Sequence, residues 1–157
     1  MLIQTKPFGE MEIDESEIIT FAEGIYAFDD VKRFALLYDA DGENPFLWLQ
    51  SAEAPDPCLL MIDPRSIYAG YDPNIPASVY GRLGADPSEK LHIFVMAVIR
   101  EDAARSTVNL LGPVIISERK KTGLQEILDA SDPRHADYKI RYPLFAGSAA
   151  KGGELQC

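Results

Sequence analysis

The residues that could carry catalysis are few in this chain of 157 residues. One cluster, Asp14, Glu15 and Glu17, could supply paired carboxylates for acid–base chemistry. The same spacing is typical of solvated charges in a loop, and we favour this second interpretation. The histidines lie in an apolar run (His92) and in a Pro-Arg-His turn (His135), away from any pattern for a nucleophile or a metal. We therefore predict that the protein is not an enzyme, and we expect no cofactor and no metal site.

The cysteines also lack the spacing of a metal site or of a disulfide framework. Cys58 lies within an apolar run and Cys157 ends a polar tail, so we expect two free thiols. No basic segment precedes an apolar run of signal-peptide length, and the longest uninterrupted apolar run, 94–99, is too short to span a bilayer. We expect a cytoplasmic protein that does not contact membranes.

The net charge of −10 is distributed unevenly along the chain. Residues 1–60 contain 13 acidic and three basic residues, whereas residues 61–157 contain 12 of each. A protein that binds nucleic acid directly needs a concentrated basic surface, so we expect no such contact here. The acidic excess is explained either by solubility alone or by attraction of a basic protein partner, and the sequence leaves both explanations open.

Short apolar runs between turn signals predict an all-β, mainly antiparallel fold, in the form of a small β-barrel-like domain. We expect strands at 2–5, 8–13, 17–21, 34–39, 46–51, 58–63, 91–100, 107–117 and 123–128. Two short helical pieces are also expected: one turn over 31–34, capped by Asp29 or Asp30, and a helix over 75–83 that ends at Gly84. The domain spans residues 1–145, and the small polar residues of 146–157 predict a flexible tail.

Two of the predicted strands carry side chains of special interest. In 46–51 we expect Phe46 and Trp48 to fill the core of a closed sheet. In 107–117, Pro113 cannot donate a hydrogen bond to a neighbouring strand, so the run must bend or change partner beside Gly112. We expect Asn109 to satisfy backbone groups at this corner; the alternative, that Asn109 belongs to a binding site, stays open.

Several blocks of sequence together carry a resemblance. They are 5–14 (TKPFGEMEID), 19–37 (ITFAEGIYAFDDVKRFALL), 45–51 (PFLWLQS), 56–57 (DP), 59–64 (LLMIDP), 107–117 (TVNLLGPVIIS) and 138–144 (YKIRYPL). In this order and spacing they resemble the flagellar assembly factor FliW family over residues 1–145. Each block alone is only a strand with a turn. The resemblance to the family is specific because the blocks occur together in this order and spacing.

The resemblance implies a regulator that is not an enzyme. Proteins of this family bind flagellin, and they also bind the RNA-binding translational repressor CsrA, exchanging one partner for the other to control flagellin translation. The family fold is a small β-barrel-like structure. We expect the free protein to be monomeric, and we expect the acidic residues of the first 60 positions to help attract CsrA.

The residues expected to contact a partner follow from their positions beside turns. Glu53, Asp56 and Asp63 flank turns after central strands, where binding residues tend to be displayed. Phe46, Gln50 and Asn109 are further candidates.

A carbohydrate-binding or hydrolytic β-domain is the alternative of a different class. In that case a groove beside carboxylates would be lined by four aromatic side chains, Trp48, Tyr68, Tyr71 and Tyr80. Nothing in the sequence fixes these four side chains at one place.

Overall fold

The computed structural model describes residues 1–39 and 45–145; the predicted tail, 146–157, lies outside them. Strands form 34% of the structure and helical turns 13%, which confirms the predicted all-β class. The strands are β1 (Leu2–Thr5), β2 (Gly9–Glu12), β3 (Ile19–Thr20), β4 (Arg33–Tyr38), β5 (Phe46–Ser51), β6 (Cys58–Ile62), β7 (His92–Val98), β8 (Thr107–Val108), β9 (Val114–Ser117), β10 (Thr122–Gln125) and β11 (Tyr142–Pro143).

The helical elements are short. They comprise the helix α1 (Ser78–Leu83) and four 3-10 turns, Glu15–Glu17, Pro64–Ser66, Ala103–Arg105 and Pro133–His135. None of the helices in the described ranges is long and apolar enough to cross a membrane.

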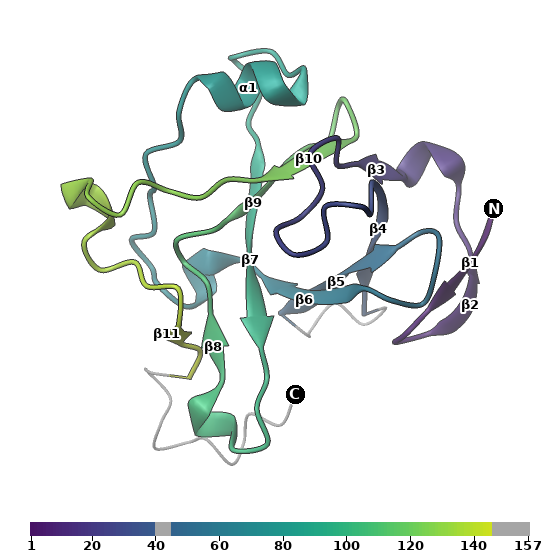
Figure 1. Ribbon diagram of the computed structural model, residues 1–157, viewed down its shortest axis with the longest axis horizontal. Helices are drawn as coiled ribbons and strands as arrows, with labels where there is room; N and C mark the ends of the chain where they lie inside the picture. The colour runs from purple at the N-terminus through teal and green to yellow at the C-terminus, as the bar shows by residue number, and fades with distance from the viewer. Residues whose placement is uncertain (40–44, 146–157) are drawn as a thin grey trace.

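Seven strands close into a barrel in the order β7, β6, β5, β4, β3, β10, β9, with β9 pairing back onto β7. The β3–β10 pair is parallel and the other pairs of the barrel are antiparallel. The hairpin β1–β2 lies to one side, and β8 and β11 extend the sheet beyond the barrel at the bottom of Figure 1. Closure removes free strand edges from the barrel itself.

The run 107–117 divides into β8 and β9 at the predicted corner. Both strands pair with the same edge of β7, but residues 109–113 are inserted opposite residues 95–96 of β7, so the chain bulges out between the two pairings. Asn109 accepts a hydrogen bond from the Leu111 amide at 3.0 Å. A Cβ on Gly112 would lie 2.9 Å from the amide nitrogen of the Asn109 side chain, which explains the glycine. The predicted bend and the structural contact of Asn109 are confirmed.

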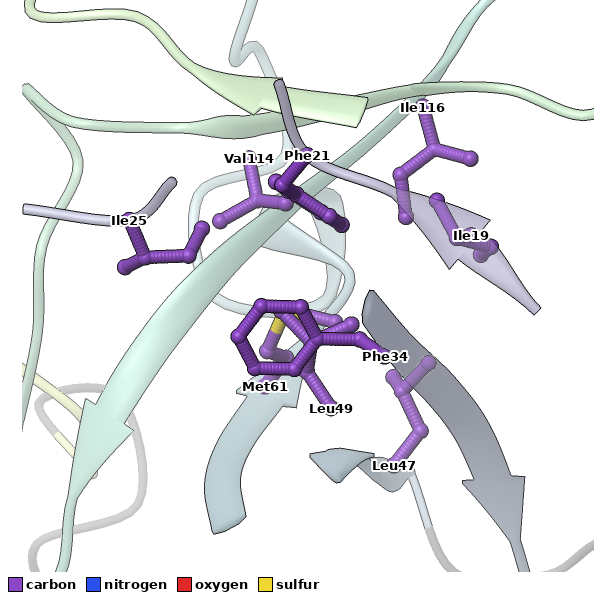
Figure 2. Close-up of a cluster of buried hydrophobic side chains, with 9 residues drawn as sticks. All are labelled: Ile19, Phe21, Ile25, Phe34, Leu47, Leu49, Met61, Val114 and Ile116. Carbon is purple, nitrogen blue, oxygen red and sulfur yellow. The ribbon is translucent and has the colours of Figure 1, made fainter. Parts of the chain in front are cut away.

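The barrel interior is filled by nine buried apolar side chains, which Figure 2 shows pointing toward one another. The loop between β3 and β4 crosses one opening of the barrel and inserts Phe21 and Ile25. The Phe21 ring lies against β10 at Gly123, where a Cβ would be 2.5 Å from the ring. The members are Ile19, Phe21, Ile25, Phe34, Leu47, Leu49, Met61, Val114 and Ile116.

The expectation that Phe46 and Trp48 fill the barrel was wrong about the face of β5. Leu47 and Leu49 point inward, so alternation along the strand places Phe46 and Trp48 on the outer face. Phe46 is buried there in a second cluster formed with the C-terminal segment. Trp48 is half-buried, packs under the β1–β2 hairpin and contacts the Phe8 ring edge to face at 5.4 Å.

The helical predictions had mixed outcomes. The helix α1 ends at Gly84 as predicted, with a left-handed φ of 69° that glycine tolerates, but it begins later than expected, at Ser78. The predicted turn over 31–34 was wrong, because β4 begins at Arg33 and places Phe34 in the barrel core. Burial of that ring outweighs the weak local preference of Asp29 and Asp30 for capping a turn.

Candidate functional site

A hollow of about 380 Å³ among β3, β4, β7 and β9 combines apolar and charged side chains, and we call it the barrel mouth. Its apolar floor is formed by partly buried and buried side chains: Ile19, Leu36, Phe94 and Ile116. Its charged or polar rim consists of Glu12, Asp14, Glu17, Tyr38, His92, Glu118 and Lys121.

Strand periodicity explains why floor and rim lie together. Side chains two positions apart share a face of a strand. Three strands therefore each supply one floor residue and, nearer the strand end, one rim residue: Leu36 with Tyr38 in β4, Phe94 with His92 in β7, and Ile116 with Glu118 just beyond β9. The mouth is the part of the barrel interior where the apolar positions give way to polar ones.

Carboxylates outnumber cations around the mouth. Lys121 contacts Glu17 at 3.5 Å, and His92 contacts Glu118 at 3.1 Å. Hydrogen bonds from the backbone and the side chain of Ser16 lower the pKa of Asp14, so its carboxylate is charged at neutral pH. The rim is therefore a negative surface around an apolar floor.

The phenol of Tyr38 responds to this field. Partial burial raises the pKa of Tyr38, and the negative charges of Glu118 and Glu17 raise it further. The hydroxyl is therefore neutral at physiological pH and serves as a hydrogen-bond donor or acceptor beside the carboxylates.

This arrangement suits the binding of a polypeptide segment. A segment with basic and apolar side chains would neutralise the rim and cover the floor. Among the described residues no cluster of histidine, cysteine, aspartate and glutamate is arranged to hold a metal ion. Burial raises the pKa of Cys58 to about 11, so this thiol stays protonated and unreactive at neutral pH.

The predicted contact residues Gln50, Glu53 and Asp56 lie together at the turn between β5 and β6. Gln50 is fully buried; its side-chain amide donates to the carbonyl of Pro55 at 3.0 Å, and its oxygen accepts from the Lys6 amide at 3.0 Å. It thereby shapes the turn and fastens it to the N-terminal hairpin. Glu53 and Asp56 are exposed on this turn, and partner contact by them stays a prediction.

The other three predicted residues lie elsewhere. Phe46 pairs with Ile62 at the far end of the β5–β6 hairpin, and Asp63 follows there. Phe46 is buried, in a position that stabilises the fold, and the Asp63 carboxylate accepts a hydrogen bond from the Arg65 amide at 2.9 Å. Asn109 lies in the bulge between β8 and β9. The six residues therefore do not form one surface.

Only part of the mouth could be predicted from the sequence. The acidic cluster at positions 14–17 contributes two of its carboxylates, Asp14 and Glu17, both from the acidic first part of the chain. Glu118 comes from the half of the chain with no net charge, and only barrel closure brings it opposite the N-terminal residues. His92, which lies at the start of an apolar run, is exposed on the rim.

The aromatic groove of the carbohydrate-binding alternative does not form. Trp48 packs under the N-terminal hairpin, whereas Tyr71 is buried in the C-terminal cluster with its hydroxyl donating to the Leu110 carbonyl at 2.8 Å. Tyr68 packs edge to face against Tyr138. These side chains therefore do not line one groove.

Comparisons with known proteins agree with this fold. The family model for the FliW protein matches residues 2–144. The chain is 38% identical over 144 residues to the flagellar assembly factor FliW of Caldicellulosiruptor saccharolyticus, covering 92% of this chain and 90% of that protein. It is 37% identical over 155 residues to the protein of the same name from Natranaerobius thermophilus, covering 97% and 99% of the two chains. A crystal structure of the flagellar assembly factor FliW superposes with a TM-score of 0.82 at 29% identity, covering 94% of this chain and 99% of the other.

Proposed function

This chain belongs to the FliW family of flagellar assembly factors, and on that basis we propose that it binds flagellin and antagonises the translational repressor CsrA by partner exchange. Flagellin bound to the protein leaves CsrA free to repress translation of the flagellin messenger. Export of flagellin releases the protein, which then sequesters CsrA, and translation resumes. The proposed exchange takes place in the cytoplasm and involves no catalysis.

The barrel mouth is the observation that supports CsrA as a partner. A repressor that binds RNA must present basic side chains to phosphates. The negative rim offers such side chains an alternative partner, and the apolar floor adds surface that association would remove from water. We therefore assign CsrA to the mouth.

Partner exchange places a thermodynamic condition on the second partner. Binding of flagellin must lower the affinity for CsrA, and linkage requires CsrA to lower the affinity for flagellin by the same factor. Either overlapping surfaces or a shared conformational change would satisfy this condition.

Size-exclusion chromatography tests the proposal directly. The purified protein is run alone, with CsrA, with flagellin, and with both. We expect the free protein to elute as a monomer, each partner to form a complex with it, and no complex to contain all three. Co-elution with flagellin alone would limit the role to assembly without translational control, and a stable ternary complex would contradict exchange.

A further inference from the structure

A second charged surface lies away from the mouth, where β7, β8 and β11 extend beyond the barrel at the bottom of Figure 1. A hollow of about 550 Å³ is present there, and we call it the arginine hollow. It is lined by Arg100, Glu101, Asp102, Arg105, Thr107 and Arg141. Three exposed arginines surround this one hollow, although the net charge of the chain is −10.

Strand register explains how the three arginines reach one place. Thr107 pairs with Val98 on one side and with Pro143 on the other, so these three side chains form a row on one face of the sheet. The arginines lie just beyond the ends of these strands: Arg100 follows β7, Arg105 ends the 3-10 turn before β8, and Arg141 precedes β11. The pairing of the three strands therefore brings their ends, and with them the three arginines, to the lining of one hollow.

The backbone beneath the arginine hollow is fixed by buried contacts. Ser106 is fully buried, and its hydroxyl accepts a hydrogen bond from the Arg100 amide at 2.9 Å. The Ser106 carbonyl accepts from the Leu144 amide at 2.9 Å, which holds the strand β11 against β8. These contacts fix the backbone on which the exposed arginine side chains are carried.

The three arginines of the hollow outnumber its two carboxylates, Glu101 and Asp102. No ion pair involves Arg100, Arg105 or Arg141 in residues 1–39 and 45–145. Asp102, on the border of the hollow, accepts a hydrogen bond from the Ala104 amide at 3.2 Å and caps a 3-10 turn. The guanidinium groups are available to an external anion, and their planar geometry suits bidentate pairing with carboxylates.

We propose that the arginine hollow docks an acidic, extended polypeptide segment of a partner protein. Carboxylates of the segment pair with the three arginines, and its alternate apolar side chains lie on Val98, which is 48% exposed, and on Pro143. Such a segment matches both the charges and the apolar row, because successive side chains of an extended chain alternate between two faces.

A polypeptide fits these observations better than a nucleic acid does. Phosphates would meet Glu101 and Asp102 on the border of the hollow. Discrete carboxylates on a segment can avoid these two side chains, whereas a continuous phosphate backbone carries charge at every nucleotide. The apolar row also has no complementary group on a phosphate backbone.

Fluorescence anisotropy with a labelled octapeptide of alternating glutamate and valine tests this proposal on the full-length protein. We expect saturable binding that weakens with added salt. The triple variant Arg100→Ala, Arg105→Ala and Arg141→Ala should bind at least roughly tenfold more weakly. The reason is that it cannot form the charge-assisted hydrogen bonds between the three guanidinium groups and the carboxylates of the peptide. Arg119→Ala, which removes one exposed arginine elsewhere, is the matched control and should bind like the wild type.

Several results would overturn the proposal. These are an absence of peptide binding, equal binding by the triple variant, or preferential, arginine-dependent binding of an octauridylate RNA. The triple variant is also mixed with CsrA, because the proposal goes beyond the proposed function and predicts that CsrA binding is retained. Loss of CsrA binding by a normally melting triple variant would instead make the hollow part of the CsrA surface. Failure of the wild type to bind CsrA would count against the proposed function alone.

Discussion

The barrel interior differs between two of its regions, the opening covered by the β3–β4 loop and the barrel mouth. The loop closes its opening by placing Phe21 and Ile25 in the core, where Phe21 lies on Gly123. At the mouth, Leu36 and Phe94 are only partly buried, and carboxylates surround them. An apolar surface left partly open and rimmed by charge is costly for stability alone and typical of a binding site. We infer that the first region stabilises the fold and the second carries recognition.

Among the substitutions that test this contrast, Phe21→Ala should have the largest effect, and the effect should be on stability. Loss of a buried ring should lower the free energy of unfolding by about 3–5 kcal/mol, because the rigid barrel cannot fill the space. Chemical denaturation measures this change. Tyr26→Ala is the control, because that ring belongs to the same loop and is 80% exposed. Similar losses for both variants would contradict the assigned role of the loop.

Gly123→Val tests the same opening from the opposite side of the contact. A Cβ would approach the Phe21 ring to 2.5 Å, so we expect a destabilisation of about 1–3 kcal/mol from overpacking. The matched control is Gly81→Ala in α1, where a Cβ meets nothing within 4 Å. That change should raise stability by about 0.5–1 kcal/mol through helix propensity. Thermal melting of both variants should therefore shift in opposite directions.

Asn109→Ala tests whether the bulge between β8 and β9 belongs with the stabilising region. Removing the acceptor of the Leu111 amide should lower stability by about 1 kcal/mol. Binding to CsrA should be unchanged, as chromatography with equal concentrations of both proteins would reveal. An unaltered melting temperature with lost partner binding would assign Asn109 to a site instead.

Neutralising the mouth should leave stability nearly unchanged and alter recognition. In the double variant Glu17→Gln and Glu118→Gln, association with CsrA should slow roughly three- to tenfold at low salt, because the rim loses two negative charges. Stopped-flow kinetics over a salt series measures the effect, which should shrink as salt rises. The exposed Asp72→Asn, outside both the mouth and the arginine hollow, is the control for loss of charge elsewhere. Equal rates for all three proteins would argue against CsrA binding at the mouth.

The smallest expected effect is on the pH dependence of stability. It involves the β3–β4 loop, which covers the closed opening of the barrel. Hydrogen bonds from Arg82 lower the pKa of Glu23 in the loop between β3 and β4. The ionised Glu23 therefore stabilises the fold above its ordinary pKa, and this contribution disappears as the pH falls through the lowered value of the folded state. Arg82→Gln should make the melting temperature less sensitive to acid below about pH 4.5, the ordinary value for glutamate. The exposed Lys90→Gln should retain the acid sensitivity of the wild type.

Local chemistry predicted those parts of the fold that a few neighbouring residues determine. Pro113 cannot take part in a regular strand pairing, so the corner beside it was visible in the sequence. Gly84 ends α1 because glycine accepts a left-handed conformation at low cost. The strand 46–51 was predicted with its observed bounds, because its apolar run lies between clear turn signals. The face of this strand was not predictable, since both of its faces are apolar and both are buried.

The sequence by itself determined the all-β class, the corner at Pro113, the N-terminal acidic excess and the resemblance to the FliW family. Only the tertiary structure decided which side chains share a surface. Barrel closure brings Glu118 to Glu17, and strand register gathers Arg100, Arg105 and Arg141 around one hollow. Local patterns report the conformation of neighbouring residues, whereas these surfaces depend on pairings between strands distant in sequence, which are fixed by packing of the whole barrel.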